Sequence, residues 1–184
     1  MNPPMEIMNQ GKPDECLACA VSAIGESALG VLIDPSYTYR MAGDGQFGLL
    51  PEKVCESVIR DGLQPMAGGG PVKAFSCFRK VFTFPFLLDT FAGIRRVLLT
   101  NKDGVLAGCY WQPEWDKCPG GIIDGMYQDL SIFPHAFRVY GTVVKDGIMY
   151  LAVQNSTGRD KGDNGTFYFP REVADRFQFA YYFI

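Results

Sequence analysis

The residues of this 184-residue chain that could perform nucleophilic chemistry are its six cysteines and its single histidine. A cysteine paired with a histidine is a compact nucleophile, because the imidazole takes the thiol proton and the ion pair then holds the thiolate. The histidine is His135, in the segment Phe133 to Phe137. An isolated histidine has a structural role more often than a catalytic one, so its position alone leaves both roles open.

Cys16 is the cysteine that the sequence places best for activation. Asp14 is a suitable N-cap for a helix over residues 15–29, and Cys16 would lie in the first turn of that helix. The partial positive charge of a helix N-terminus lowers the pKa of a thiol. The carboxylates of Asp14 and Glu15 would raise that pKa if their charges lay close, but we expect them to cap the helix and to face solvent.

The other cysteines have less reactive predicted settings. Cys19 lies one turn further into the same helix, Cys55 is in the middle of another helix, and Cys109 is inside an apolar strand. The spacing of Cys16 and Cys19 also occurs in zinc sites, but no second pair with this spacing follows, so we expect no metal ion. The N-terminal residues lack the pattern of a signal peptide, which predicts reduced thiols without disulfides.

Acyl transfer by a thiolate also needs hydrogen-bond donors for the oxyanion and a group that orients the base. Gln10 precedes Cys16 by six residues, across a Gly-Lys-Pro sequence that can turn the amide back towards the start of the helix. Asn155 follows an apolar segment and precedes a Ser-Thr-Gly sequence. Each of these two residues, taken alone, is equally an ordinary polar loop or turn residue. Together with Cys16 and His135 they form an ordered set.

The elements that must position these residues begin with a helical half. Apolar residues such as Leu17 and Val21 recur at helical spacing, which buries one face of a helix. Prolines suited to a first helical turn occur at positions 35 and 51. The predicted helices cover residues 15–29, 34–39, 51–62 and 90–99, and residues 63–89 are expected to be irregular with one short extended piece.

A strand half follows residue 101. Short apolar or alternating segments there have strand lengths, and the Lys-Asp-Gly sequence at 145–147 is typical of a hairpin turn. The predicted strands cover residues 105–110, 137–144, 149–153, 166–169 and 179–183. A helical half followed by a strand half is an α+β arrangement.

Composition excludes several classes of protein. Apolar residues make up 47% and charged residues 20% of the chain, which indicates a folded protein. The net charge of −3 argues against a general nucleic-acid or anionic-membrane binder, which would need a basic face. No apolar run approaches the roughly 18 residues of a membrane helix. We therefore expect one domain over residues 1–184, with no nucleic-acid and no membrane partner.

Four blocks in the right order and spacing give the chain a resemblance to the papain-like cysteine peptidases over nearly its whole length. Residues 155–165 resemble the family's Asn-Ser-Trp-Gly-x-x-Trp-Gly-x-x-Gly run at every position except the two tryptophans. The other blocks are Gln10-Gly11 with Cys16-Leu17-Ala18, the Asp-Pro-Ser-Tyr sequence at 34–37, and His135-Ala136 with Gly141.

The resemblance implies a role for each member of the ordered set. Cys16 would be the nucleophile and His135 the general base and acid. Asn155 would orient the imidazole. Gln10 and the backbone N–H of Cys16 would form the oxyanion hole. No cofactor is implied.

The implied fold has two lobes, a helical lobe followed by a β-barrel-like lobe, with the active-site cleft between them. Residues 10–100 would form the mainly helical lobe and residues 101–184 the mainly β lobe. Gly48, Leu49, Leu50 and Pro51 resemble the segment that binds the substrate backbone. Leu50 and Pro51, together with Ala136, would favour an apolar side chain two residues before the scissile bond.

Three family tryptophans are replaced here, by Leu17, Thr157 and Lys161. Because the tryptophan at position 157 usually shields the Asn–His hydrogen bond, we expect the Asn155–His135 bond to be more open to water. The alternative is that Trp111 or Trp115, which precede His135, folds over the bond instead.

The resemblance also bears on processing and location. Pro13 stands where the family has a disulfide-forming cysteine, which fits a reducing compartment. Gln10 lies close to Met1, which predicts either the mature form of a longer precursor or a minimal form without a propeptide. A cytoplasmic or virion-associated monomer that acts on a peptide or protein substrate is expected. The alternatives to an endopeptidase are a catalytically weak module that binds a peptide or virion partner, and a hydrolase of isopeptide or peptidoglycan-peptide bonds.

Overall fold

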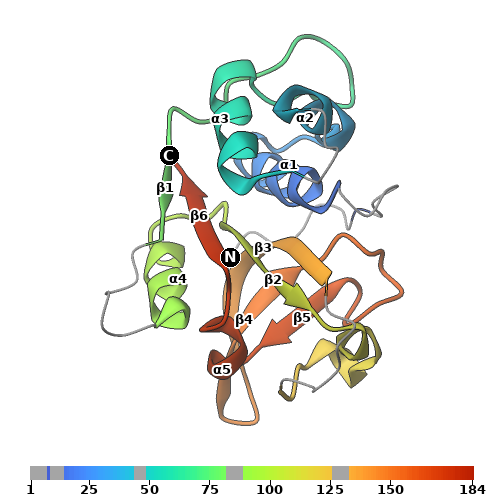
Figure 1. Cartoon of the computed structure of the whole chain (residues 1–184), viewed down its shortest axis with the longest axis vertical. Coiled ribbons are helices and arrows are strands. Elements are labelled where there is room, and N and C mark those ends of the chain that lie inside the picture. The colour runs from blue at the N-terminus through green and yellow to red at the C-terminus, as the bar shows by residue number, and fades with distance from the viewer. Residues whose placement is uncertain (1–7, 9–14, 44–48, 82–88, 126–132) are drawn as a thin grey trace.

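The computed structural model of the chain describes residues 8, 15–43, 49–81, 89–125 and 133–184. Three helices gather at one end of the molecule, and the sheet with further helices packed against it forms the other, as Figure 1 shows. The predicted α+β class is confirmed. None of the helices in the described residues is long and apolar enough to span a membrane.

The helical end contains three of the described helices. They are α1 (Cys16–Leu29), α2 (Pro35–Ala42) and α3 (Pro51–Asp61). Two of them begin at a local sequence signal, while the N-cap of α1 makes no side-chain capping hydrogen bond. The side chain of Asp34 caps α2 by accepting a hydrogen bond from the backbone N–H of Ser36 at 2.9 Å. The N-cap of α1 is Glu15 rather than the predicted Asp14, which lies outside the described residues. Helix ends predicted from single residues carry an uncertainty of this size.

The strands form one six-stranded sheet in which all neighbouring strands are antiparallel. They are β1 (Phe78–Lys80), β2 (Val105–Trp111), β3 (Phe133–Lys145), β4 (Ile148–Gln154), β5 (Thr166–Phe169) and β6 (Phe179–Phe183). Their order in the sheet is β1-β6-β2-β3-β4-β5, so β1 and β5 are its edges. The predicted barrel-like lobe is therefore an open sheet and not a closed barrel.

One strand prediction is wrong at the position of the histidine. His135 does not precede β3 but lies inside it, opposite Cys109 of β2. The apolar pattern on which the prediction rests begins only at Phe137. In the structure β4 pairs with β3 only from Arg138 onward, so the segment with Pro134 has a ladder partner on one side only. A proline is tolerated there because its missing N–H removes no hydrogen bond of the ladder.

Shorter elements complete the fold. The helix α4 (Thr90–Leu98) was predicted and packs against β2, β3 and β6. The 3-10 helices η2 (Pro113–Lys117) and η3 (Pro119–Gly121) and the single-turn helix α5 (Arg171–Ala174) were not predicted. These elements are too short for a periodic apolar pattern to appear in the sequence. The predicted hairpin turn between β3 and β4 is confirmed, with left-handed backbone at Asp146 and Gly147.

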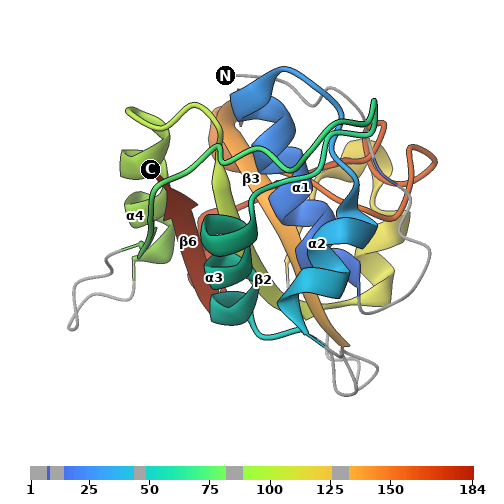
Figure 2. The same ribbon diagram turned by 90° about the horizontal axis from the view of Figure 1, so that it is seen from above.

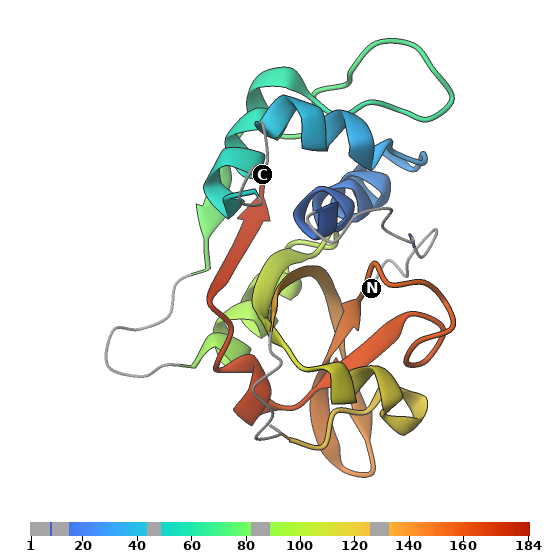
Figure 3. The same cartoon turned by 45° about the vertical axis from the view of Figure 1, so that its right-hand side comes forward.

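Two apolar cores hold these elements together. We call them the helical core, which joins α1 and α3 to the sheet and contains Cys16 and Ala136, and the sheet core, which contains Trp111 and Phe137. Each core contains residues from both of the expected lobes, 10–100 and 101–184. The sheet core includes Phe91 of α4, while the helical core includes residues of β6. Figures 2 and 3 show α1 lying across the sheet at β3.

Candidate active site

The helix that begins with Cys16 packs against the strand that carries the histidine. α1 packs against β3, and both Cys16 and Ala136, the residue after His135, belong to the helical core. A small pocket between α1 and the sheet is lined by Cys19 of α1, by Ala136, and by Asn155 at the end of β4. The predicted site residues Cys16, His135 and Asn155 are up to 139 positions apart in the sequence. They lie in α1, in β3 and directly after β4, and β3 contacts both α1 and β4.

A short hydrogen bond joins the histidine to the asparagine. His135 Nε2 lies 2.6 Å from Asn155 Oδ1. The same Oδ1 accepts a hydrogen bond from the backbone N–H of Ser156 at 2.8 Å, and Asn155 Nδ2 donates to Thr157 Oγ1 at 3.0 Å. The contact with Ser156 fixes which end of the amide is oxygen, because a backbone N–H can only donate. Because Oδ1 can only accept, Nε2 must carry the proton, and Nδ1 is the basic nitrogen of the neutral ring.

The hydrogen bond is buried. His135 is 4% exposed and Asn155 is 2% exposed. Burial lowers the pKa of His135, while the hydrogen bond to Asn155 and the negative charge of Asp116 act in the opposite direction. The expectation that Thr157 would leave this bond open to water is therefore wrong.

A tryptophan from β2 packs against the histidine. The ring of Trp111 lies edge-to-face against the ring of His135, with 5.0 Å between the ring centroids. Its indole N–H donates to Asp116 Oδ1 at 3.0 Å. The ring centroids of Trp115 and Trp111 are 5.3 Å apart, and Trp115 donates its own N–H to the backbone carbonyl of Gly125. Of the two tryptophans that the sequence suggested as a cover, Trp111 contacts the histidine and Trp115 packs behind it.

The cysteines differ in how readily they could ionise. Burial is the main cause that raises the pKa of Cys19 and of Cys55 to about 12, and it also raises the pKa of Cys109. Cys16 is the first residue of α1, where the dipole of the helix favours a negative charge. None of the six cysteines, all of which the structure describes, forms a disulfide.

The predicted substrate-binding residues are placed as follows. Leu50 is the N-cap of α3 and is 64% exposed, and Pro51 is the first residue of that helix. Leu49 is half-buried against the helical core, and Ala136 is buried within it. Gln10 and Gly48 lie outside the described residues.

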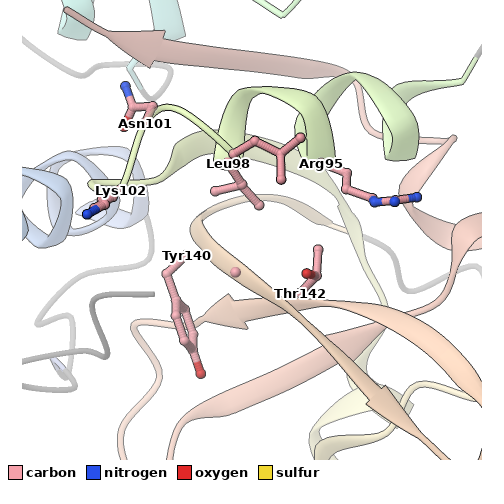
Figure 4. A pocket seen from close by; sticks show the side chains of 8 residues that line it. Arg95, Leu98, Asn101, Lys102, Tyr140 and Thr142 are labelled. Carbon is pink, nitrogen blue, oxygen red and sulfur yellow. The ribbon is translucent and has the colours of Figure 1, made fainter.

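A separate hollow lies between α4 and β3, five residues along β3 from the histidine (Figure 4). Its volume is about 100 Å³, and Arg95, Lys102 and Tyr140 are among the residues that line it. The lining contains no cysteine or histidine, so this hollow lacks the nucleophile chemistry of the candidate site. Across the described ranges, no group of three or more histidine, cysteine or acidic residues could hold a metal ion.

Comparison with known proteins gives matches in structure but not in sequence. No model of a known protein family matches the sequence, and no curated protein matches it. The bromelain protease from Ananas comosus, solved with the inhibitor E64, is 17% identical with a TM-score of 0.77, over 97% of this chain and 93% of that chain. Xylellain, a cysteine protease from Xylella fastidiosa, is 17% identical with a TM-score of 0.77, over 97% of this chain and 81% of that chain.

A third similar structure is a proform. The Amb a 11 cysteine protease, a major ragweed pollen allergen, is 19% identical with a TM-score of 0.76. The match covers all of this chain and 62% of that chain. At identities this low, the likeness concerns the fold.

Proposed function

We propose that this chain, which has the papain-like α+β fold of those structures, is a cysteine endopeptidase that hydrolyses peptide bonds through Cys16 and His135. The observation that carries the proposal is the buried 2.6 Å hydrogen bond from His135 Nε2 to Asn155 Oδ1. It leaves Nδ1 as the basic nitrogen of a histidine on the strand against which the cysteine-bearing helix packs. A base whose tautomer is fixed by a third residue is the arrangement that nucleophilic catalysis requires.

In the proposed first step, His135 Nδ1 takes the proton of the Cys16 thiol, and the thiolate attacks the carbonyl carbon of the scissile bond. The carbonyl π electrons move to oxygen, which becomes an oxyanion. The backbone N–H of Cys16 and the side-chain amide of Gln10 would donate hydrogen bonds to it.

The oxyanion then collapses and the carbon–nitrogen bond breaks. The imidazolium returns its proton to the departing amine, which leaves a thioester between Cys16 and the acyl part of the substrate. In the second half, His135 takes a proton from water and the hydroxide oxygen attacks the thioester carbon. The carbon–sulfur bond then breaks, and the imidazolium returns its proton to the departing sulfur. The product is a carboxylic acid, and the thiol is restored.

The substrate would be a peptide or protein with an apolar side chain two residues before the scissile bond. Leu50 supports this preference, because it presents a large exposed apolar side chain at the start of α3. An exposed apolar group of this kind can lose water on contact with an apolar side chain of the substrate.

Intact-mass measurement after treatment with an epoxide inactivator of thiol peptidases tests the proposal. We expect a single adduct, on Cys16, although the chain has six cysteines. The His135→Ala variant should react far more slowly, and the Cys19→Ala variant at the normal rate. Adducts spread over several cysteines, or the absence of any adduct on Cys16, would indicate an inert module and overturn the proposal.

Asn155→Ala should lower turnover by about ten- to a hundredfold, or about 1.4–2.7 kcal/mol in activation free energy. The reason is that His135 Nε2–H loses its acceptor, so neither the ring orientation nor its tautomer stays fixed. Turnover is measured on one peptide with an apolar residue two before the scissile bond.

Thr157→Val is the matched control for this variant. It keeps the shape of the side chain but removes the oxygen that accepts from Asn155 Nδ2. Because the bond from His135 to Asn155 Oδ1 stays, the loss of turnover should be smaller than in Asn155→Ala. Full turnover in Asn155→Ala would contradict the orienting role.

A further inference from the structure

We propose that Trp111 is a positioning residue that holds the imidazole of His135 and keeps water away from its hydrogen bond to Asn155. The role deepens the proposed function and rests on it for its catalytic meaning. The structural part, the exclusion of water, can be tested without any catalysis.

The register of the sheet brings the indole to the histidine. Cys109 lies opposite His135, and Trp111 lies opposite Phe133. Residues two positions apart in a strand share a face of the sheet, so Trp111 and His135 are diagonal neighbours on one face. Their ring centroids are 5.0 Å apart with an angle of 69° between the ring planes.

The indole of Trp111 is held from several sides. Its N–H donates to Asp116 Oδ1 at 3.0 Å. Its ring centroid lies 5.3 Å from that of Trp115 and 5.0 Å from that of Phe167. The residue is 1% exposed. A ring that is hydrogen-bonded at one end and packed on its other sides cannot easily turn away from His135.

The other side chains near the histidine are less suited to exclude water. Phe133 lies further away, at 6.1 Å, and is 43% exposed. Phe137 is tilted against the imidazole at 6.4 Å. Thr157 is half-buried and its hydroxyl is used as the acceptor for Asn155 Nδ2. Trp111 therefore makes the nearest of the three aromatic contacts to the imidazole.

The exclusion of water strengthens the hydrogen bond between His135 and Asn155. A hydrogen bond in a medium of low dielectric constant is stronger than the same bond exposed to water, which competes for both partners. The contact between Trp111 and Asp116 also places a negative charge in the surroundings of His135, where it favours the protonated ring.

The test uses the fact that the chain has one histidine, so a ¹⁵N-labelled sample gives one set of imidazole signals. The measured quantity is the rate at which the Nε2 proton of His135 exchanges with water. Trp111→Phe should raise this rate by about tenfold, the factor that corresponds to about 1.4 kcal/mol of hydrogen-bond free energy.

Trp115→Phe is the matched control, because Trp115 is equally buried and packs behind Trp111. It should lower thermal stability to a similar extent but leave the exchange rate within about twofold of wild type, well below the tenfold effect above. Asp116→Ala is a second variant that leaves the indole in the core and removes its hydrogen-bond acceptor together with the negative charge near His135, and it should give an intermediate rise. Equal rates in all variants, or an equal rise in both tryptophan variants, would overturn the proposal.

The outcomes also separate this inference from the proposed function. If wild type hydrolyses no peptide and does not react with the epoxide, the peptidase assignment fails. A proton exchange rate that rises in Trp111→Phe and not in Trp115→Phe would still support the exclusion of water by Trp111. If the enzyme is active, Trp111→Phe should lower kcat by about tenfold with KM unchanged, since a misplaced base affects the transition state and not substrate binding. Loss of activity without a change in proton exchange would refute the proposed role of Trp111.

Discussion

Cys16→Ala should abolish peptide hydrolysis, with kcat/KM falling by about 10⁶-fold, the scale of effect that removal of a nucleophile has in other hydrolases. Alanine has no atom that can form the thioester, and no other side chain stands in its place at the start of α1. Binding of the substrate should persist, because the variant removes a single sulfur atom. The measurement is hydrolysis of a peptide together with substrate affinity from a direct binding assay.

Two controls make this result specific. Alanine is the residue with the highest helix propensity, so α1 should form normally and thermal unfolding should change little. Cys19→Ala removes a buried thiol one turn later in the same helix and should keep full activity. Hydrolysis that survives in a well-folded Cys16→Ala variant would place the nucleophile elsewhere in the chain.

His135→Gln should lower kcat/KM at pH 7 by about 10⁴- to 10⁶-fold, because base and nucleophile act as one unit. Glutamine keeps a polar side chain of similar reach, so Asn155 still has a hydrogen-bonding neighbour. It has no basic nitrogen to take the proton of Cys16, and only the thiolate form of cysteine attacks. The variant therefore depends on spontaneous ionisation of the thiol.

The pH dependence of the remaining rate identifies this mechanism. The thiolate fraction grows about tenfold with each pH unit below the pKa of the thiol, so the rate of His135→Gln should rise by the same factor. Wild type should instead have a plateau near neutral pH, since the imidazole supplies the thiolate there. If the rate of His135→Gln depends on pH in the same way as the rate of wild type, His135 is not the base.

Local signals predicted most helix boundaries. Asp34 with Pro35 marks the start of α2, and Pro51 with Gly62 marks the two ends of α3. These are capping effects between residues close in sequence, which is why they can be predicted without the fold. The short elements η2, η3 and α5 have no such pattern and were missed.

The features of the site that were predicted wrongly depend on contacts between distant strands. The start of β3 was predicted only at Phe137, because the sequence does not reveal that β2 pairs with β3 as far as Phe133. Thr157 suggested an exposed hydrogen bond because the sequence does not fix the register that sets Trp111 beside His135. Both are consequences of strand pairing, which a single sequence specifies only weakly.

The ordered set of candidate residues came from residue types, spacing and a family resemblance. His135 and Asn155 form the expected hydrogen bond, and Cys16 begins the helix that was expected to activate it. The chemistry of these residues remains a prediction, as does the oxyanion role of Gln10. The experiments on Cys16→Ala and His135→Gln test the chemistry of the nucleophile and the base directly.

The position of β6 has a consequence for biosynthesis. β6 follows every other described element along the chain, yet it lies between β1 and β2 in the sheet. Its residues Tyr181 and Phe183 belong to the helical core, while Ala180 belongs to the sheet core. Protein segments emerge from the ribosome in order and begin to fold as they appear. A nascent chain that has not yet released β6 therefore lacks a strand that contributes to both cores, so its sheet is completed only after translation has delivered that strand.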